Sequence, residues 1–367
     1  MIDRRVLQNI DWMLLALAIG VTVLGIVNLY SATYVGHQGT ERGVYLKQAL
    51  WMGLGLVALL VMLVPDYRTF ERAAYPIYWA SVALLVAVLF IGTIAKGSQR
   101  WLAFGPVTIQ PSELAKLGVV IALARFFHHN KAQDGYGLLA LVRPLALVGI
   151  PFLLVLKQPD LGTALLIAFI GGTLFLFVPI RTRSLLTILL VGIVVGFIAW
   201  KFSLHDYQRM RVLTFLEPER DPLNTGYQAI QSKIAVGSGG IWGKGFLHGT
   251  QTQLNFLPEQ QTDFIFSVLA EEWGFVGAGL VVVLYMTLIL YSLNVARSSK
   301  DGFGALLGAG IVGMLFWPVF VNIGMVLGFM PVVGVPLPFM SYGGSSLIVT
   351  FAALGLLMNI RMRRFTF

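Results

Sequence analysis

The side chains best suited to chemistry lie in four short polar stretches that interrupt an otherwise apolar chain. Asp263 lies near the end of the stretch 255–264, which also carries Glu259. A carboxylate in such a place can take the proton from an attacking hydroxyl and act as a general base. A structural role fits as well, because Thr262 or Asp263 could cap the helix that follows. The sequence leaves both interpretations open.

A second stretch combines a cation, an aromatic ring and a charge pair. Arg100 can bind a phosphate and Trp101 can stack on a sugar or a lipid, although both are also ordinary interface anchors. Glu113 and Lys116 are three residues apart and share one helix face. They either close the helix end as an ion pair or place Lys116 in a water-filled cavity. Ser112 is the predicted N-cap of this helix.

Five further candidates for substrate binding lie in a tight turn and in a long polar loop: Lys157, Asp160, Arg209, Arg211 and Lys244. Asp160 could equally be the N-cap of the next helix. The loop cations can bind phosphate oxygens. The glycines around Lys244 lack the preceding strand and following helix of a nucleotide-binding loop, so a nucleotide fold is not expected.

The last stretch, residues 331–346, holds three prolines and three glycines and cannot form a regular helix. Irregular backbone near membrane depth is tolerated only where protein buries it or where it lines a cavity. This proline-rich segment is therefore the strongest indication of a site, with Ser341, Tyr342, Gly343 and Gly344 as candidate substrate-binding residues. It could also simply seal a junction between two spans.

The elements that position these stretches are membrane spans. Hydrophobic residues make up 57% of the chain and charged residues 12%, against about 25% charged residues in soluble domains. The absence of cysteine excludes disulfides and thiolate metal sites. The net charge of +9 comes from Lys and Arg clusters between apolar runs, which is a topology signal and does not indicate a nucleic-acid partner.

An all-α, polytopic fold with about ten transmembrane helices follows from the apolar runs, because a span needs roughly 20 residues. Lys and Arg concentrate in alternate short connections, which predicts that both chain ends lie in the cytoplasm. The spans are expected near residues 12–31, 45–64, 74–95, 112–127, 138–156, 161–179, 184–201, 275–293, 304–329 and 342–360.

A large loop at about 202–263 is expected on the outer side, folded into short helices and turns. The apolar segment after it, residues 263–293, would be about 46 Å long as one straight helix, which exceeds the hydrocarbon thickness. Counting back from its inner end therefore places Glu271 and Glu272 at the outer interface, with Gly274 as a plausible bend.

These stretches, in this order, resemble the motifs of the SEDS family, which includes RodA, FtsW and SpoVE. The resemblance is carried by residues 97–116, 157–163, 257–275 and 322–346, and it covers essentially the whole chain. Residues 251–264 and 331–338 look most like the RodA branch. Gln261 stands where many members carry His. The resemblance implies one transmembrane SEDS domain over residues 1–367, including the large loop.

Members of this family are peptidoglycan glycosyltransferases of the bacterial cytoplasmic membrane. The resemblance implies that this chain polymerises lipid II into β-1,4-linked glycan at the outer face, for elongation and rod shape. It implies a cognate class B penicillin-binding protein and other elongation-complex membrane proteins as partners. Asp263 matches the family's essential Asp, and Trp101 matches a functionally important Trp.

An inverting, single-displacement transfer fits these residues, with Asp263 as general base. The diphosphate leaving group would need cations, and a divalent ion such as Mg²⁺ or Mn²⁺ could assist, although the sequence shows no metal-binding cluster. The alternatives are a lipid II flippase, a division-type polymerase like FtsW, and a non-catalytic scaffold. A flippase would need polar residues deep in the membrane, whereas the polar stretches here crowd one side.

Overall fold

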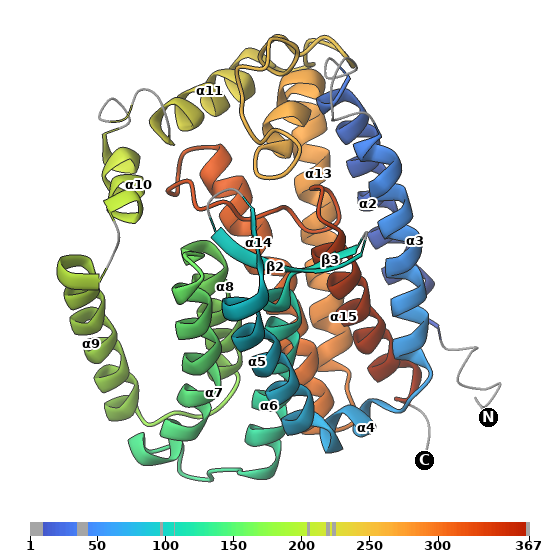
Figure 1. The fold of residues 1–367 in the computed structure, drawn as a ribbon. Coiled ribbons are helices and arrows are strands. Elements are labelled where there is room, and N and C mark those ends of the chain that lie inside the picture. The colour runs from blue at the N-terminus through green and yellow to red at the C-terminus, as the bar shows by residue number, and fades with distance from the viewer. Residues whose placement is uncertain are drawn as a thin grey trace.

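The computed structural model describes residues 10–34, 43–95, 98–105, 107–203, 206–217, 221 and 225–364. Within these ranges, ten long helices form a bundle, and shorter helices cover one end of it (Figure 1). The long helices are α2 (Trp12–Ala32), α3 (Val44–Leu63), α5 (Ala74–Ile91), α6 (Pro111–His129), α7 (Leu138–Lys157), α8 (Leu161–Leu176), α9 (Thr182–Ile198), α13 (Ile265–Arg297), α14 (Gly302–Val326) and α15 (Gly344–Met362).

Each predicted span corresponds to one of these helices, and the all-α polytopic class is confirmed. Eight helices in the described part of the chain are long and apolar enough to cross a membrane. The other two are α8, which has 16 residues, and α6, whose apolar surface is interrupted by charged residues. Neighbouring helices bury most of α6, including Glu113 and Lys116, so these two charges are kept from lipid.

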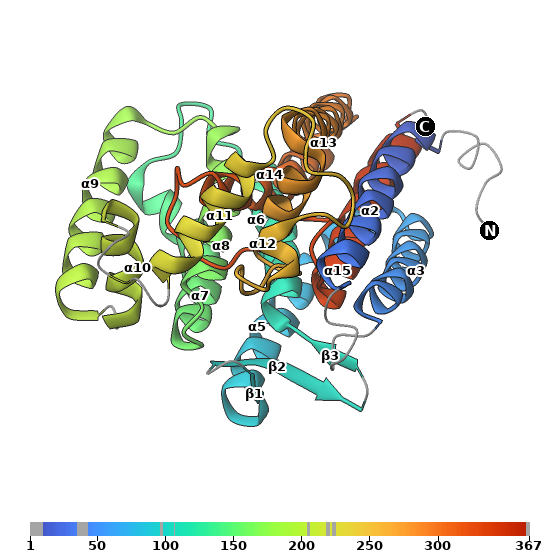
Figure 2. The same cartoon turned by 90° about the horizontal axis from the view of Figure 1, so that it is seen from above.

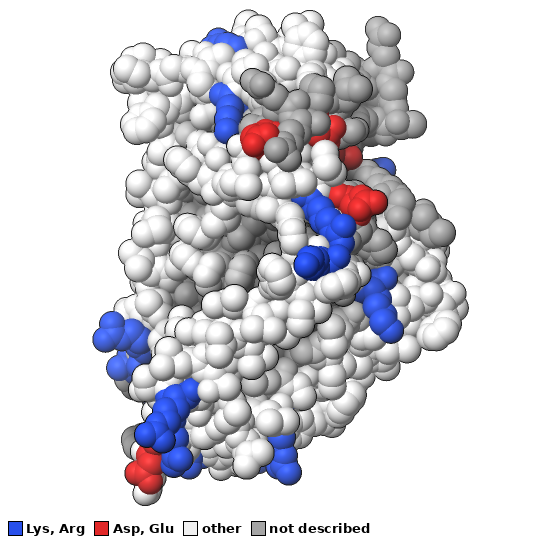
Figure 3. Space-filling model, turned by 90° about the vertical axis from the view of Figure 1, so that its left-hand side faces the viewer, with Lys and Arg blue, Asp and Glu red and all other residues white. Residues whose placement is uncertain are grey.

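The bundle has a densely buried centre and one loosely packed edge. Most residues of α6, α14 and α15 are buried, whereas Ser184 is the one buried residue of α9. Seen from above, α9 lies at one edge of the bundle (Figure 2). On that side of the molecule, Lys and Arg gather at the lower margin, and further charged residues of both signs lie in the upper half (Figure 3).

Contacts between distant parts of the chain place its two ends on the same side. The carboxylate of Asp11, the N-cap of α2, forms an ion pair with Arg361 near the end of α15. Tyr291 near the end of α13 donates a hydrogen bond to the same carboxylate (3.0 Å). An even number of crossings requires this arrangement, and the cytoplasmic location of both ends stays a prediction.

A small antiparallel sheet, which the sequence did not predict, follows α5. Its strands are β1 (Thr93–Ala95), β2 (Ser98–Phe104) and β3 (Val107–Ile109), in the order β1-β2-β3. The predicted third span, residues 74–95, is therefore too long, because α5 ends at Ile91. The strands lie outside α5 and α6 (Figure 2). They are short and pair locally, so they show little of the alternating pattern of longer strands.

The start of α6 differs from the prediction. Gln110 is its N-cap, and Pro111 is the first residue inside the helix. Ser112 therefore lies in the first turn and does not cap the helix. Proline is favoured at this first position because its fixed φ suits the helix and its missing N–H would have no partner there anyway.

The predicted large loop forms α10 (Asp206–Leu216), α11 (Thr225–Ser238) and α12 (Thr250–Gln253), preceded by a π-helical turn (Ala199–Ser203). Helix α11 crosses the upper end of the bundle (Figure 1). Ser232 fixes it there, because its hydroxyl donates to the carbonyl of Val326 (2.9 Å) and shares a hydrogen bond with Ser267 (2.9 Å). We call this the outer end, following the predicted topology.

Helix α13 bends at Gly274, as the sequence predicts. Gly274 has φ +65° and ψ −163°, a conformation that glycine adopts readily. The glycine-rich loop around Lys244 packs against this bend, since the N–H of Phe275 donates to the carbonyl of Gly240 in that loop (2.9 Å). The helix axis of the outer part of α13, residues 265–273, therefore differs in direction from the axis of the rest of the helix.

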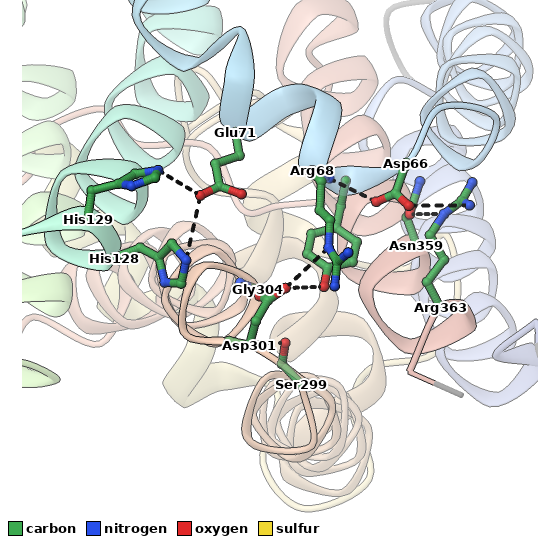
Figure 4. Close-up of polar contacts among 11 residues, drawn as sticks. Asp66, Arg68, Glu71, His128, His129, Ser299, Asp301, Gly304, Asn359 and Arg363 are labelled. Carbon is green, nitrogen blue, oxygen red and sulfur yellow. Dashed lines mark hydrogen bonds and ion pairs between the residues drawn. The ribbon is translucent and has the colours of Figure 1, made fainter. Parts of the chain in front are cut away.

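At the opposite, inner end, the short helix α4 (Tyr67–Arg72) is tied to three other helices (Figure 4). Tyr67 donates a hydrogen bond to Asp301 (2.5 Å), which also pairs with Arg68 (3.6 Å). Burial and this neighbouring carboxylate raise the pKa of Tyr67 to about 12, so the phenol stays protonated. Glu71 lies 3.1 Å from the ring nitrogen Nε2 of His129.

Candidate functional site

Asp263 lies half-buried in the turn that precedes α13. The N-cap of α13 is Phe264, and no side chain caps this helix end. The capping interpretation is therefore wrong for both Thr262 and Asp263.

The backbone around Asp263 is fixed by the proline-rich segment. The side-chain amide of Asn322 in α14 donates to the backbone carbonyls of Asp263 (2.9 Å) and Val335 (2.7 Å). It thereby joins the turn before α13 to the proline-rich segment. Gly334 lies against the carboxylate, because a Cβ atom at this position would be 3.2 Å from Oδ2 of Asp263. Its φ of +71° also favours glycine. Asp263 is thus positioned from two sides.

A second set of hydrogen bonds joins the same two segments one turn further on. The hydroxyl of Ser341 donates to the carbonyl of Thr262 (2.5 Å), and the N–H of Tyr342 donates to the carbonyl of Gln261 (3.0 Å). Glu259 accepts a hydrogen bond from the Thr262 hydroxyl (3.2 Å). Two stretches that the sequence singled out separately, one with Glu259 and Asp263 and the other with Ser341 and Tyr342, therefore lie together.

Helix α3 supports this arrangement from the other side. The fully buried Gln48 donates to the carbonyl of Ser341 (2.9 Å) and accepts from the N–H of Gly343 (3.3 Å). A Cβ atom on Gly344 would lie 2.5 Å from the ring of Trp51. Gly343 and Gly344 therefore serve close packing and backbone hydrogen bonding, which is a structural role for two predicted substrate-binding residues.

Arg100 on β2 forms an ion pair with Asp160 in the turn before α8, with 3.2 Å between Nη1 and Oδ2. The other oxygen of Asp160 accepts a hydrogen bond from the N–H of Thr163 (3.1 Å), so the predicted N-cap of α8 is confirmed. One carboxylate thus caps a helix and orients a cation. The Arg100 side chain remains 30% exposed, which leaves it able to contact a bound anion.

The Asp160 turn packs directly onto the proline-rich segment. A Cβ atom on Gly162 would lie 2.6 Å from the carbonyl oxygen of Val333. Val333 precedes Gly334, which touches Asp263 on its other side. The Arg100–Asp160 pair and the Asp263 carboxylate are therefore placed by the same short piece of backbone.

Glu113 and Lys116 in the first turns of α6 form a buried ion pair (2.8 Å). The ion pair at the helix end, one of the two predicted arrangements, is therefore present, and both residues are at least nine-tenths buried. Ser345 of α15 links the start of α6 to the small sheet, because its hydroxyl accepts from the N–H of Gln110 (3.1 Å) and donates to the carbonyl of Thr108 (3.1 Å). Half-buried Trp101 lies on β2 of that sheet.

Three predicted cations are engaged elsewhere or stand apart. Lys244 forms an ion pair with the fully buried Glu271 (2.6 Å) and also donates to Thr250 (2.8 Å). Arg209 on α10 donates to the carbonyl of Lys201 (3.0 Å). Lys157 is the exposed last residue of α7. We therefore assign Lys244 to the anchoring of the loop over α13.

Arg211 lies over a shallow pocket beside the proline-rich segment. Lys233 of α11, which the sequence reasoning did not single out, lines the same pocket together with Gly328 and Pro331. Two cations therefore face the start of the segment that holds Asp263. These two cations stand apart from Arg100 on β2 and are candidates for contact with an anionic group at the surface.

Several residues that position the site were missed by reasoning on the four polar stretches. Gln48 and Asn322 are single polar residues within apolar helices, and a buried polar residue in a span usually has a specific partner. The sequence placed Glu271 only at the depth of the outer interface; its burial and its ion pair with Lys244 of the outer loop were not predicted. The described residues contain no group of three or more His, Asp or Glu that could hold a metal ion.

The fold and the site define a polytopic helical membrane protein with a carboxylate and several cations gathered at one end of the bundle. The profile of the FtsW, RodA and SpoVE family, described as "Cell cycle protein", matches residues 11–365. The chain belongs to this family, also called SEDS. It is accordingly a multi-pass protein of the bacterial inner membrane.

Individual relatives agree with this assignment. The chain is 46% identical over 339 residues to peptidoglycan glycosyltransferase MrdB of Escherichia coli, which covers 92% of this chain and 90% of that protein. One chain of a solved structure, described as "Structural coordination of polymerization and crosslinking by a peptidoglycan synthase complex", is 38% identical to this protein, with a TM-score of 0.79. The match covers 98% of this chain and 99% of that chain. Rod shape determining protein RodA of Thermus thermophilus has a TM-score of 0.72 and 31% identity, covering 98% of both chains.

Proposed function

We propose that this protein is a peptidoglycan glycosyltransferase that polymerises lipid II into β-1,4-linked glycan at the outer face of the cytoplasmic membrane, for cell elongation. The names of MrdB and of the rod shape determining RodA support this activity and this role. The observation that carries the assignment of the site is the placement of Asp263, which does not cap α13; Asn322 fixes its backbone carbonyl, and Gly334 lies against its carboxylate.

In the proposed reaction, the 4-hydroxyl of one lipid II sugar attacks the anomeric carbon of the glycan held by the lipid diphosphate. Asp263 takes the hydroxyl proton as the new C–O bond forms, and the bond to the diphosphate breaks with its electron pair remaining on the phosphate oxygen. General base catalysis of this kind contributes about 10²–10⁴-fold. Diphosphate is a good leaving group, so no second, protonated carboxyl is required.

The negative charge that develops on the diphosphate needs stabilisation by cations. Arg100 is the best placed of the candidates, because it is partly exposed and its partner Asp160 lies two residues before Gly162, which packs against the segment that holds Asp263. Arg211 and Lys233 would provide a second anion-binding position. Lys116 is buried against Glu113, so it would act on charge at a distance.

A class B penicillin-binding protein is the proposed partner, which would cross-link the glycan as it emerges. The similarity to a chain of a peptidoglycan synthase complex supports this proposal. Co-purification of the two proteins from one membrane extract tests it.

The role in elongation has its own test. Depletion of this protein should cause the cells to lose their rod shape.

The central experiment measures glycan polymerisation from purified lipid II in liposomes that contain the protein and its partner. Wild type should make long glycan, whereas Asp263→Ala and the isosteric Asp263→Asn should make essentially none. Equal yield, equal thermal unfolding and equal partner binding serve as folding controls. Polymer from the Asn variant would exclude Asp263 as the base.

If wild type with a competent partner makes no glycan, the transferase proposal fails. A lipid II translocation assay on the same liposomes would then test the flippase alternative. A scaffold would retain partner binding and support growth with Asp263→Asn.

A further inference from the structure

A large cavity lies at the inner end of the bundle, away from every residue assigned above. Its volume is about 510 Å³, within the range of about 300–1,000 Å³ that is typical of ligand pockets. Phe127 near the end of α6 and Phe177 after α8 line it, together with Leu306 at the start of α14. Along α6, Phe127 lies sixteen residues beyond Pro111, which corresponds to about 24 Å. The cavity is thus separate from the outer site.

The wall of this cavity is almost entirely apolar, and Lys131 is its one charged residue. Tyr136 and Pro179 complete the wall from two inner loops. The N–H of Tyr136 donates to the carbonyl of Pro179 (2.9 Å), and the N–H of Arg181 donates back to the carbonyl of Tyr136 (3.2 Å). Because backbone hydrogen bonds join the two loops, the cavity is preformed.

The depth of the cavity suits a lipid chain. Helix α8 has 16 residues, which is about 24 Å, shorter than the roughly 30 Å of hydrocarbon. Its inner end therefore lies within or just at the acyl layer. Leu176 and Phe177 at this end are 81% and 52% exposed. An apolar surface of this kind next to an apolar cavity is suited to contact with acyl chains.

The charges at this end favour an anionic head group. Lys131 lines the cavity, and the exposed Arg181 packs against the same loop, with its Nε donating to the carbonyl of Asp134 (3.4 Å). Asp134 is the exposed acid on that loop, so the two cations outnumber it. Lys and Arg also gather at this lower margin in Figure 3. Basic pockets between helices on the cytoplasmic side are sites where anionic lipid head groups bind.

We propose that this cavity binds one acyl chain of an anionic phospholipid of the inner leaflet, whose phosphate is bound by Lys131. The lipid ties together the ends of α6, α8 and α14 on the inner side. The site is independent of glycan synthesis, since none of its residues contributes to the outer site.

The test uses the full-length protein in nanodiscs with equal amounts of phosphatidylglycerol and phosphatidylcholine. After extraction into mild detergent, native mass spectrometry counts the phospholipids that remain bound. One cation near the membrane surface contributes about 1 kcal/mol, so wild type should retain phosphatidylglycerol about fivefold over phosphatidylcholine. Ala305→Trp, which fills the cavity, should lose the retained lipid, and Lys131→Glu should lose the preference.

Two matched variants control for bulk and charge. Leu190→Trp adds the same ring to the lipid-facing surface of α9, and Arg183→Glu reverses a nearby exposed charge; both should retain lipid as wild type does. If Ala305→Trp fails to fold, Ala132→Phe fills the cavity from the loop side. The proposal is overturned if wild type retains no lipid, if it retains both lipids equally, or if the control variants lose lipid to the same extent as Ala305→Trp.

Discussion

Gly334→Ala is the sharpest test of how Asp263 is positioned. An L-residue in the left-handed region costs about 1–2 kcal/mol, and Gly334 has φ +71°. The new Cβ atom would lie 3.2 Å from Oδ2 of Asp263, which is tighter than an ordinary contact, so the carboxylate must shift. A misplacement of about 1 Å in an active site can cost about 10²-fold in rate. Polymerisation should therefore fall by about tenfold to a hundredfold.

The rate of glycan synthesis from lipid II, measured with the partner present, gives the result. Gly240→Ala is the matched control, because Gly240 has φ +58° in the outer loop and open space where the Cβ atom would lie. Both variants should lose about 1–2 kcal/mol of stability, and only Gly334→Ala should lose activity. If Gly334→Ala polymerises within twofold of Gly240→Ala, the contact with Asp263 does not matter and the reasoning is refuted.

Three further changes separate capping, charge and backbone support. Asp160→Asn should keep the helix cap, because Asn caps well, but it removes the partner of Arg100, so polymerisation should fall severalfold at unchanged thermal stability; equal activity would contradict a positioning role. Lys244→Ala leaves the carboxylate of Glu271 buried without a cation, which should cost on the order of 3 kcal/mol in unfolding experiments; an unchanged melting temperature would show that the loop is anchored otherwise. Gln48→Leu leaves two backbone groups of the proline-rich segment without partners, at about 1–3 kcal/mol, and should lower stability and glycan yield together, whereas a loss of yield alone would point to substrate contact.

The spans could be predicted because lipid forces each of them to be a long apolar helix. The bend at Gly274 could be predicted for a related reason, since a straight α13 would be longer than the membrane is thick. The small sheet escaped prediction because its strands are only three to seven residues long. The N-cap of α6 was misplaced because Pro111 fits inside the first turn as well as before it.

The candidate site could be predicted only as a set of separate stretches. The irregular backbone of residues 331–346 indicated a site, and Asp263 was recognisable by resemblance. No local pattern shows that Gly334 meets Asp263, or that Asn322 joins the two, because these contacts link residues about 60 to 70 positions apart. The engagement of Lys244 by Glu271 was hidden for the same reason.

The burial of α6 has a consequence for how the protein is made. A helix that carries Glu113 and Lys116 would insert poorly by itself, since each ionised group at the bilayer centre costs about 2.5–3.5 kcal/mol on insertion scales, and less toward the helix end. Their ion pair offsets part of this cost only after both side chains have been transferred from water into the bundle. Helix α5, which carries no charged residue, is the span before α6 and packs along it. Translocon-mediated insertion of α5 and α6 as one helical hairpin would let the apolar helix carry the charged one into the bilayer, with the small sheet as the translocated tip.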